Sequence, residues 1–216
     1  MEYILLGDGG HSRVIREMIH EKFGDKVVAI LDDKYTVINE KTSIIYGPLS
    51  LIDQLLTENR KVVIAIGSNQ VRKKIQHQLK IDSFQYGKVI HSSAIVSSSA
   101  FIGNGTVIMP GVYINAGVSI NEHCIINTGA IIEHDTKIDS FVHISPNATL
   151  TGDVSIEEGV HIGASSTVIP GKHVGSWSTV GAGSTVIKNI PSQSTAVGCP
   201  TRIVSEQIKN NMEIRL

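Results

Sequence analysis

Two histidines stand in the segment IIEHDTKIDSFVH, residues 131–143, which otherwise follows a repeating pattern of isoleucine and small or polar residues. His134 lies between Glu133 and Asp135, and His143 follows nine residues later. An imidazole titrates near pH 6.5 and can accept a proton in neutral solution. A carboxylate bound to its other ring nitrogen would fix the tautomer and stabilise the imidazolium. The segment therefore contains a candidate general base, with Glu133 or Asp135 as its partner.

A six-residue periodicity predicts the elements that position these histidines. An aliphatic residue recurs at every sixth position from Ile90 to Val186, and a small residue usually follows it four positions later. Each unit predicts one short strand, and three strands predict a triangular coil of 18 residues whose inward side chains stack. Successive coils would pair at the inter-strand spacing of about 4.8 Å. The sequence thus predicts a parallel β-helix over 86–202, followed by a C-terminal tail, 203–216, to which we assign no function.

Residues eighteen positions apart are neighbours in adjacent predicted coils. His134 is then expected on the coil surface between Ala116 and Gly152, whose small side chains leave a hollow beside the ring. His143 is expected next to His161. A solvent-facing histidine of no function is the plain alternative, and the flanking acids and small neighbours favour a catalytic one.

Residues 1–85 alternate strands with helices. EYILLG, KVVAILDD and RKVVIAIGSN read as strands, and amphipathic segments follow each, so we expect a small parallel sheet, half of a doubly wound α/β fold. Ligands bind at the carboxyl ends of such strands, where glycines let a backbone approach a phosphate. GDGGHS lacks the third glycine of the dinucleotide fingerprint, but the three loops together favour a nucleotide pocket. Its candidate residues are Gly7, Asp8, Gly9, Gly10, His11, Asp32, Asp33, Gly67, Ser68 and Asn69.

GDGGHSR, AILDD, AIGSNQVR and a hexapeptide helix carrying EHD occur here in an order that resembles the sialic-acid-type sugar O-acyltransferase family of hexapeptide-repeat acyltransferases. Within it, the chain is most similar to bacterial N-acetyltransferases of UDP-4-amino sugars of the bacillosamine type, over nearly its whole length. The resemblance implies a half-Rossmann domain that holds the UDP-sugar and a left-handed β-helix that binds acetyl-CoA. It also implies a homotrimer with active sites between subunits and a role in bacterial polysaccharide, including exopolysaccharide, or glycan biosynthesis.

Residue roles follow from the same resemblance. The loop from Gly7 to Ser12 would contact the UDP-sugar, and Asp32 and Asp33 would lie near the uridine. His134 would be the general base in direct attack of the sugar 4-amine on acetyl-CoA, and His143 would hydrogen-bond near the thioester or its oxyanion. The third-strand loop reads AIGSN where many relatives have AIGDN, which leaves the sugar contacts open. Residues expected along acetyl-CoA are His143, Gly152, His161, Gly163, Ala164, Gly181, Gly183, Lys188 and Arg202.

Composition excludes several other classes. The net charge of −1 and pI near 6.7 argue against a nucleic-acid partner. No apolar run approaches a membrane span, and MEYILLGDGG lacks the basic region of a secretory signal. Two cysteines form no disulfide framework or metal motif, so we expect no metal and a cytoplasmic location.

Three alternatives stay open at this point. The enzyme could instead transfer acetyl to a hydroxyl of sialic acid or of another sugar, and not to a sugar amine. A zinc carbonic anhydrase of the γ type shares the β-helix, but no pair of histidines in the repeats has its H-x4-H spacing. A non-catalytic solenoid joined to a nucleotide sensor would bind the sugar without releasing a thiol from acetyl-CoA.

Overall fold

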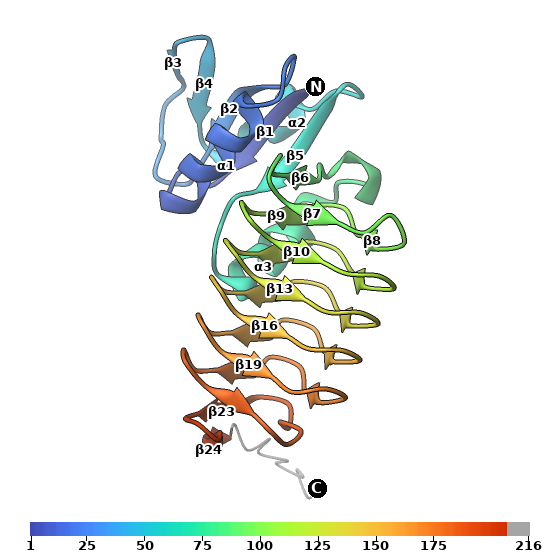
Figure 1. Cartoon of the computed structure of the whole chain (residues 1–216). Helices are drawn as coiled ribbons and strands as arrows, with labels where there is room; N and C mark the ends of the chain where they lie inside the picture. Colours follow the sequence, from blue (N-terminus) through green and yellow to red (C-terminus); the bar gives the residue numbers. More distant parts are fainter. Residues whose placement is uncertain (207–216) are drawn as a thin grey trace, which may run out of the picture.

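The computed structural model describes residues 1–206, in an N-terminal α/β unit and a β-helix (Figure 1). In the first unit β1, β2 and β5 run parallel, as the sequence predicts. A hairpin that the sequence pattern did not predict, β3 with β4, extends the sheet beside β2, so the strand order is β3-β4-β2-β1-β5. The elements are β1 (Glu2–Leu6), α1 (Gly10–His20), β2 (Lys26–Leu31), β3 (Asn39–Lys41), β4 (Ile44–Gly47), η1 (Leu49–Leu51), α2 (Ile52–Leu55), β5 (Arg60–Ile64), α3 (Asn69–Leu79) and η2 (Ser83–Gln85).

The β-helix has three faces, each a stack of parallel strands. We call the face that the N-terminal unit covers the docking face. Its strands are β6 (Val89–Ile90), β9 (Val107–Ile108), β12 (Ile125–Ile126), β15 (His143–Ile144), β18 (His161–Ile162), β21 (Thr179–Val180) and β23 (Ser194–Val197), joined by the antiparallel β24 (Arg202–Glu206). The second face contains β7 (Ile95–Val96), β10 (Tyr113–Ile114), β13 (Ile131–Ile132), β16 (Thr149–Leu150), β19 (Thr167–Val168) and β22 (Thr185–Val186). The third contains β8 (Phe101–Ile102), β11 (Ser119–Ile120), β14 (Lys137–Ile138), β17 (Ser155–Ile156) and β20 (His173–Val174).

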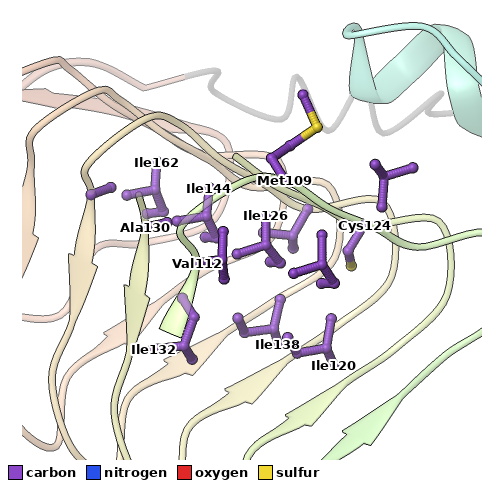
Figure 2. Close-up of a cluster of buried hydrophobic side chains, with 14 of the residues drawn as sticks. Met109, Val112, Ile120, Cys124, Ile126, Ala130, Ile132, Ile138, Ile144 and Ile162 are labelled. Atoms are coloured by element: carbon purple, nitrogen blue, oxygen red, sulfur yellow. The ribbon is translucent and has the colours of Figure 1, made fainter. Parts of the chain in front are cut away.

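The six-residue pattern is confirmed by the packing inside the coils. Every inward aliphatic residue from Ile102 to Val186 is buried, and only Ile90 and Val96, at the first coil, are half-buried. Figure 2 shows Ile126, Ile132 and Ile138 inside the coils. The small residues four positions on are buried as well, and the polar ones among them bond to backbone oxygens: the Thr136 hydroxyl, for example, donates to Thr151 O at 3.1 Å.

Each coil corner requires a left-handed backbone residue. From Gly105 to Gly183, every sixth residue has a positive φ. Glycine, Asn and Asp adopt this conformation at the least cost, and most corners carry them. His123, Phe141 and Trp177 are the bulky exceptions, and all three stand in one column, with Gly159 between the last two, at the corner that precedes the docking face.

Helix α3 leaves the N-terminal sheet and lies against this corner (Figure 1). Outward side chains of the docking face are buried there, among them Val107, Met109 and Ile125. Within residues 1–206, no helix has the length and apolar character needed to cross a membrane. Residues 203–206, which the sequence analysis placed in the C-terminal tail, belong to β24, and the remainder of that tail lies outside the described residues.

Candidate functional site

His134 projects from the corner between the second and third faces, where Asp135 takes the positive φ of 61° that turns the chain. The side chain is 62% exposed, and its Nδ1 lies 2.9 Å from Asp135 Oδ2. This hydrogen bond, aided by the charges of Asp135, Glu133 and Asp153, raises the pKa of His134 above its ordinary value. The structure thus pairs the ring with Asp135, and the corner turn brings the two side chains together.

The ring of His134 leans over the next coil at Gly152. A Cβ added to Gly152 would lie 2.6 Å from both Cε1 and Nε2 of the ring. Glycine at this position therefore leaves the room that the Cε1 and Nε2 atoms of the imidazole occupy while Nδ1 bonds to Asp135. The ring itself therefore occupies the space over Gly152 that was expected to form part of a hollow beside His134.

His143 and His161 lie one above the other on the docking face, with parallel rings 4.9 Å apart. Asn127 Nδ2 lies 3.1 Å from His143 Nε2, and the Ser145 hydroxyl lies 2.8 Å from His161 Nε2. Burial, followed by the charges of His161, Arg72 and His11, lowers the pKa of His143 to about 3, against a hydrogen bond with the Gly67 backbone that raises it. His143 is therefore a neutral ring held at the junction with the N-terminal unit.

His134 and His143 do not meet within one chain. His134 occupies the corner opposite the docking face, and His143 points outward from the docking face itself, so the apolar interior of the coil separates them. A site that uses both side chains therefore needs two copies of the chain.

A pocket at the junction joins the third-strand loop to the docking face. Its volume is about 270 Å³, and it is lined by Gly67, Ser68, Asn69, Gln70, Gly159, His161, Trp177 and Thr179. Two groups of residues that the sequence analysis proposed for different ligands, the Gly67–Asn69 loop and His161, thus share one pocket. Gln70, Gly159, Trp177 and Thr179 are new members that sequence reasoning missed.

The carboxyl edge of the sheet has a second, smaller pocket of about 110 Å³, lined in part by Gly7, Asp32 and Asp33. Gly7 has a φ of +104°, and a Cβ there would lie 2.6 Å from Ile66 Cγ1, so the turn accepts only glycine. Gly9 and Gly10 have open space where a Cβ would stand, which leaves their backbone accessible.

Asp8 is already engaged in a polar network at this edge. Tyr35 donates to its carboxylate at 2.5 Å, Lys34 pairs with it at 2.8 Å, and its N–H donates to Asp32 at 2.8 Å. Burial raises the pKa of Asp8, but the bonds from Lys34 and Tyr35 outweigh it and hold that pKa below its ordinary value. Asp8 is a charged, anchored carboxylate rather than a free one.

His11 and Ser12 begin α1 and turn toward the protein interior. Ser12 is 1% exposed, and its hydroxyl has no partner within the described residues. Burial and the charge of Arg72 lower the pKa of His11 to about 4. Ser12 is therefore not gathered with the open glycines of the loop.

At the far end of the β-helix, Lys188 and Arg202 line the same cavity of about 480 Å³. No carboxylate lies among its lining residues, all of which belong to the described part of the chain, so the donor set fits a phosphate group. Gly163 and Gly181 have a structural reason to be glycine: a Cβ would lie 2.5 Å from Ala182 N at Gly163 and 2.8 Å from Val197 Cγ1 at Gly181. Gly183 instead has open space where a Cβ would stand, and a φ of +66°. Ala164 lies next to this stretch and accepts a backbone bond from Gly183 at 2.8 Å.

The residues that join the two units were not anticipated from the sequence. Arg72, from α3, is 1% exposed and donates to carbonyl oxygens of both units. Tyr86 packs edge-on against His123, and His123 stacks on Phe141 with ring centroids 5.2 Å apart. One signal could have revealed this surface: aromatic rings stand at three of the four successive corners His123, Phe141, Gly159 and Trp177, where the positive φ favours glycine.

Because His123 is buried at this junction, we expect the free energy of unfolding to decrease in acid. Burial and the charge of Arg72 lower the pKa of His123 to about 4, and neither ring nitrogen has a partner within residues 1–206. An unfolded histidine titrates near 6.5. Between about pH 4 and 6.5 the unfolded chain therefore binds more protons, so the free energy of unfolding decreases as the pH falls through this window. We expect His123→Phe, which keeps a stacking ring, to lose less melting temperature between pH 7 and pH 5 than the wild type.

His77→Phe is the matched control, because His77 lies on the exposed side of α3. An equal acid loss in wild type and His123→Phe would remove His123 as a source of the effect.

Comparison with known proteins finds a separate family match in each of the two units. Residues 2–79 match the PglD N-terminal domain family, and residues 99–134 match the bacterial transferase hexapeptide (six repeats) family. UDP-N-acetylbacillosamine N-acetyltransferase of Bacillus subtilis (strain 168) is 47% identical over 95 residues, which are 43% of this chain and 44% of that protein. The match therefore spans less than half of the curated relative.

Two solved structures are similar over almost the whole chain. PerB from Caulobacter crescentus, in complex with CoA and GDP-perosamine, is 33% identical with a TM-score of 0.86, covering 95% of this chain and 98% of that one. The acetyltransferase domain of PglB from Neisseria gonorrhoeae FA1090, in complex with acetyl coenzyme A, is 33% identical with a TM-score of 0.84, covering 94% and 98%.

Proposed function

This chain belongs to the family of hexapeptide-repeat sugar N-acetyltransferases, and from that premise we propose that it transfers acetyl from acetyl-CoA to the 4-amino group of a UDP-linked amino-deoxy sugar. The observation that carries the proposal is the state of His134. Its imidazole is exposed, Nδ1 is bonded to Asp135, and Nε2 lies over Gly152 and makes no hydrogen bond within the described residues.

When bound, acetyl-CoA supplies an activated acetyl group, and its transfer forms an amide C–N bond and breaks the thioester C–S bond. A sugar amine is protonated near neutral pH and attacks only after losing a proton. His134 Nε2 accepts the proton that the sugar amine releases, and Asp135 stabilises the imidazolium that forms. The departing sulfur takes up a proton, so the products are the acetamido sugar and free CoA.

No covalent enzyme intermediate is required. Burial raises the pKa of the Cys124 thiol to about 12, so this cysteine is inert as a nucleophile. Cys199 is exposed, with its Sγ 3.2 Å from Thr185 Oγ1 at the far end of the β-helix. Both are free thiols, which suits a reducing, cytoplasmic location.

The proposed ligand contacts follow from the pockets. The sheet edge at Gly7, Asp32 and Asp33 would take the nucleotide, and the junction pocket would take the sugar or the acyl end of the donor. Lys188 and Arg202 would bind the phosphates of acetyl-CoA. His143 would contribute near the thioester only if its ring exchanged its present partners.

We propose a homotrimer in which the His134 corner of one copy faces the coil of another. Two features support an assembly: His134 and His143 lie on opposite sides of one coil, and Ile95, Phe101 and Tyr113 are large apolar side chains exposed on the second and third faces. Exposed apolar side chains grouped on one part of a surface favour a protein contact.

The deciding experiment mixes the protein with acetyl-CoA and a panel of acceptors while free CoA thiol is measured. The panel contains UDP-4-amino, GDP-4-amino and CMP-linked sugars, each 4-amino compound matched by its 4-hydroxy analogue. We expect thiol release with 4-amino acceptors alone and preference for UDP over GDP. Release with hydroxyl acceptors would favour O-acetylation, and nucleotide-sugar binding without any release would favour a sensor.

An acetylated nucleotide sugar is an activated glycosyl donor. A product of this kind would supply bacterial polysaccharide, including exopolysaccharide, or glycan synthesis. That role belongs to the proposal and rests on the same assay.

A further inference from the structure

Two side chains from the first turn of α3 donate hydrogen bonds to backbone carbonyl oxygens of three successive coils. Arg72 donates through Nε to His123 O at 3.0 Å and through Nη2 to Phe141 O at 3.0 Å and Val142 O at 3.3 Å. Asn69 donates through Nδ2 to the carbonyl oxygens of the following coil, Gly159 O and Val160 O, both at 3.0 Å.

The same guanidinium also donates hydrogen bonds to the loop that follows β5. Arg72 Nη1 donates to Ile66 O at 3.1 Å and to Gly67 O at 2.9 Å, and Nη2 donates to Asn69 Oδ1 at 2.9 Å. Every acceptor is a neutral carbonyl or amide oxygen; no carboxylate pairs with this buried cation within the described residues. A planar fork of donors can bind two groups of oxygens at fixed angles, which a lysine ammonium cannot reproduce.

Both groups of oxygens adjoin the junction pocket. Gly67 and Asn69 line it directly, and Phe141 and Val142 immediately precede His143, whose ring stacks on the pocket residue His161. The buried guanidinium of Arg72, supported by Asn69, therefore joins the loop to the docking face beside this pocket.

Lys73 strengthens the same contact from the next position of α3. Its ammonium pairs with Glu158 at 2.7 Å and lies 5.1 Å from the centre of the Trp177 ring. Trp177 also lines the junction pocket and is the one tryptophan of the chain. Its fluorescence therefore reports the geometry of the junction directly.

We propose that Arg72 is a positioning residue for the transfer reaction: it holds the Gly67–Asn69 loop at a fixed distance from the two adjacent coils that bear His143 and His161. This role rests on the proposed acetyl transfer. In that reaction Arg72 touches no reacting atom. It acts by keeping the Gly67–Asn69 loop correctly placed against the docking face, the two sides of the junction pocket.

The test compares Arg72→Lys with Arg60→Lys in the full chain. Arg60 is a fair control, because it lies in the same unit and donates to Glu2 and to Leu55 O without touching the β-helix. For Arg72→Lys we expect kcat to fall about tenfold, with KM for acetyl-CoA and the Kd of the UDP-sugar changed by less than about threefold. Acrylamide quenching of Trp177 should increase in the same variant. Arg60→Lys should match the wild type in all four measurements.

The outcomes separate the two proposals. If the wild type releases no thiol with any acceptor, the proposed acetyl transfer is wrong. Acrylamide quenching of Trp177 in Arg72→Lys then still tests whether Arg72 holds the loop against the β-helix. Normal kcat and normal Trp177 quenching in Arg72→Lys would overturn the positioning role, as would a loss that appears only in KM.

If Arg72→Lys does not fold, Asn69→Ser decides the matter. It removes the two bonds to Gly159 and Val160 and the bond that Asn69 Oδ1 accepts from Arg72, and it leaves the bonds of Arg72 to the backbone of both units in place. A kcat reduced about threefold with more accessible Trp177 supports the positioning role, and an unchanged kcat contradicts it.

Discussion

Replacing His134 with alanine is expected to lower kcat by roughly 10² or more, because the acceptor amine then loses its general base. Binding of the nucleotide sugar should persist, since the Gly7 and Asp32 edge of the sheet belongs to a different unit of the chain. Thiol release under saturating substrates measures the first effect, and calorimetric titration of the UDP-sugar measures the second. Near-normal turnover in this variant would remove His134 from the mechanism.

Matched changes on either side of the ring identify its partner. Asp135→Asn removes the carboxylate that lies 2.9 Å from Nδ1, whereas Glu133→Gln changes an acid that makes no hydrogen bond to the ring. We expect a clear loss of kcat in the first variant and a small one in the second. The reverse order would assign the orienting role to Glu133.

The pH profile gives an independent check on this pair. Asp135 raises the pKa of His134, and only the neutral ring can accept a proton, so activity should decline as the pH falls through that raised pKa. Asp135→Asn removes the main cause of the shift, and the acidic limb of kcat should move to lower pH. An acidic limb that does not move would mean that another group controls it.

Substituting Gly152 with alanine is expected to reduce kcat by roughly 10- to 100-fold while the coil stays intact. The added Cβ would lie 2.6 Å from the His134 ring, so the ring must leave its place over the next coil. Displacing a catalytic group by about 1 Å can cost up to about 10²-fold in rate. Steady-state thiol release measures the loss, and circular dichroism with thermal melting verifies the fold.

Ala116→Ser provides the control for added bulk at this corner. Ala116 is the coil neighbour of His134 on the side away from Gly152, and it is exposed. We expect its turnover to remain close to that of the wild type. Equal losses in both variants would indicate a general sensitivity of the corner and not a place reserved for the ring.

The candidate site could be predicted in part. His134 could be placed on the coil surface beside Gly152, because the side-chain direction follows directly from the position within the six-residue unit. The choice between Glu133 and Asp135 could not be made, because it depends on which residue takes the left-handed turn. His143 follows the same register but lies half-buried at the junction, which the repeat alone does not reveal.

The reasons for particular glycines also divide in this way. Gly7 is restricted to glycine by its positive φ and by Ile66, and a side chain at Gly152 would displace the His134 ring. Gly163 and Gly181 read in the sequence as an opening for a ligand, yet the next coil already occupies the space a side chain would need. Glycine is favoured both where another backbone approaches closely and where a ligand does, so the sequence alone does not distinguish the two.

What the sequence determined by itself is the β-helix, its register and the surface position of His134. Each inward residue repeats after six positions, and period and burial are local properties that no distant contact has to supply. Only the tertiary structure decided how the N-terminal unit docks, through Arg72 and Asn69 on the carbonyl oxygens of three coils. Backbone oxygens exist at every residue and carry no sequence signal, so a junction built on them becomes visible only when the chain is folded.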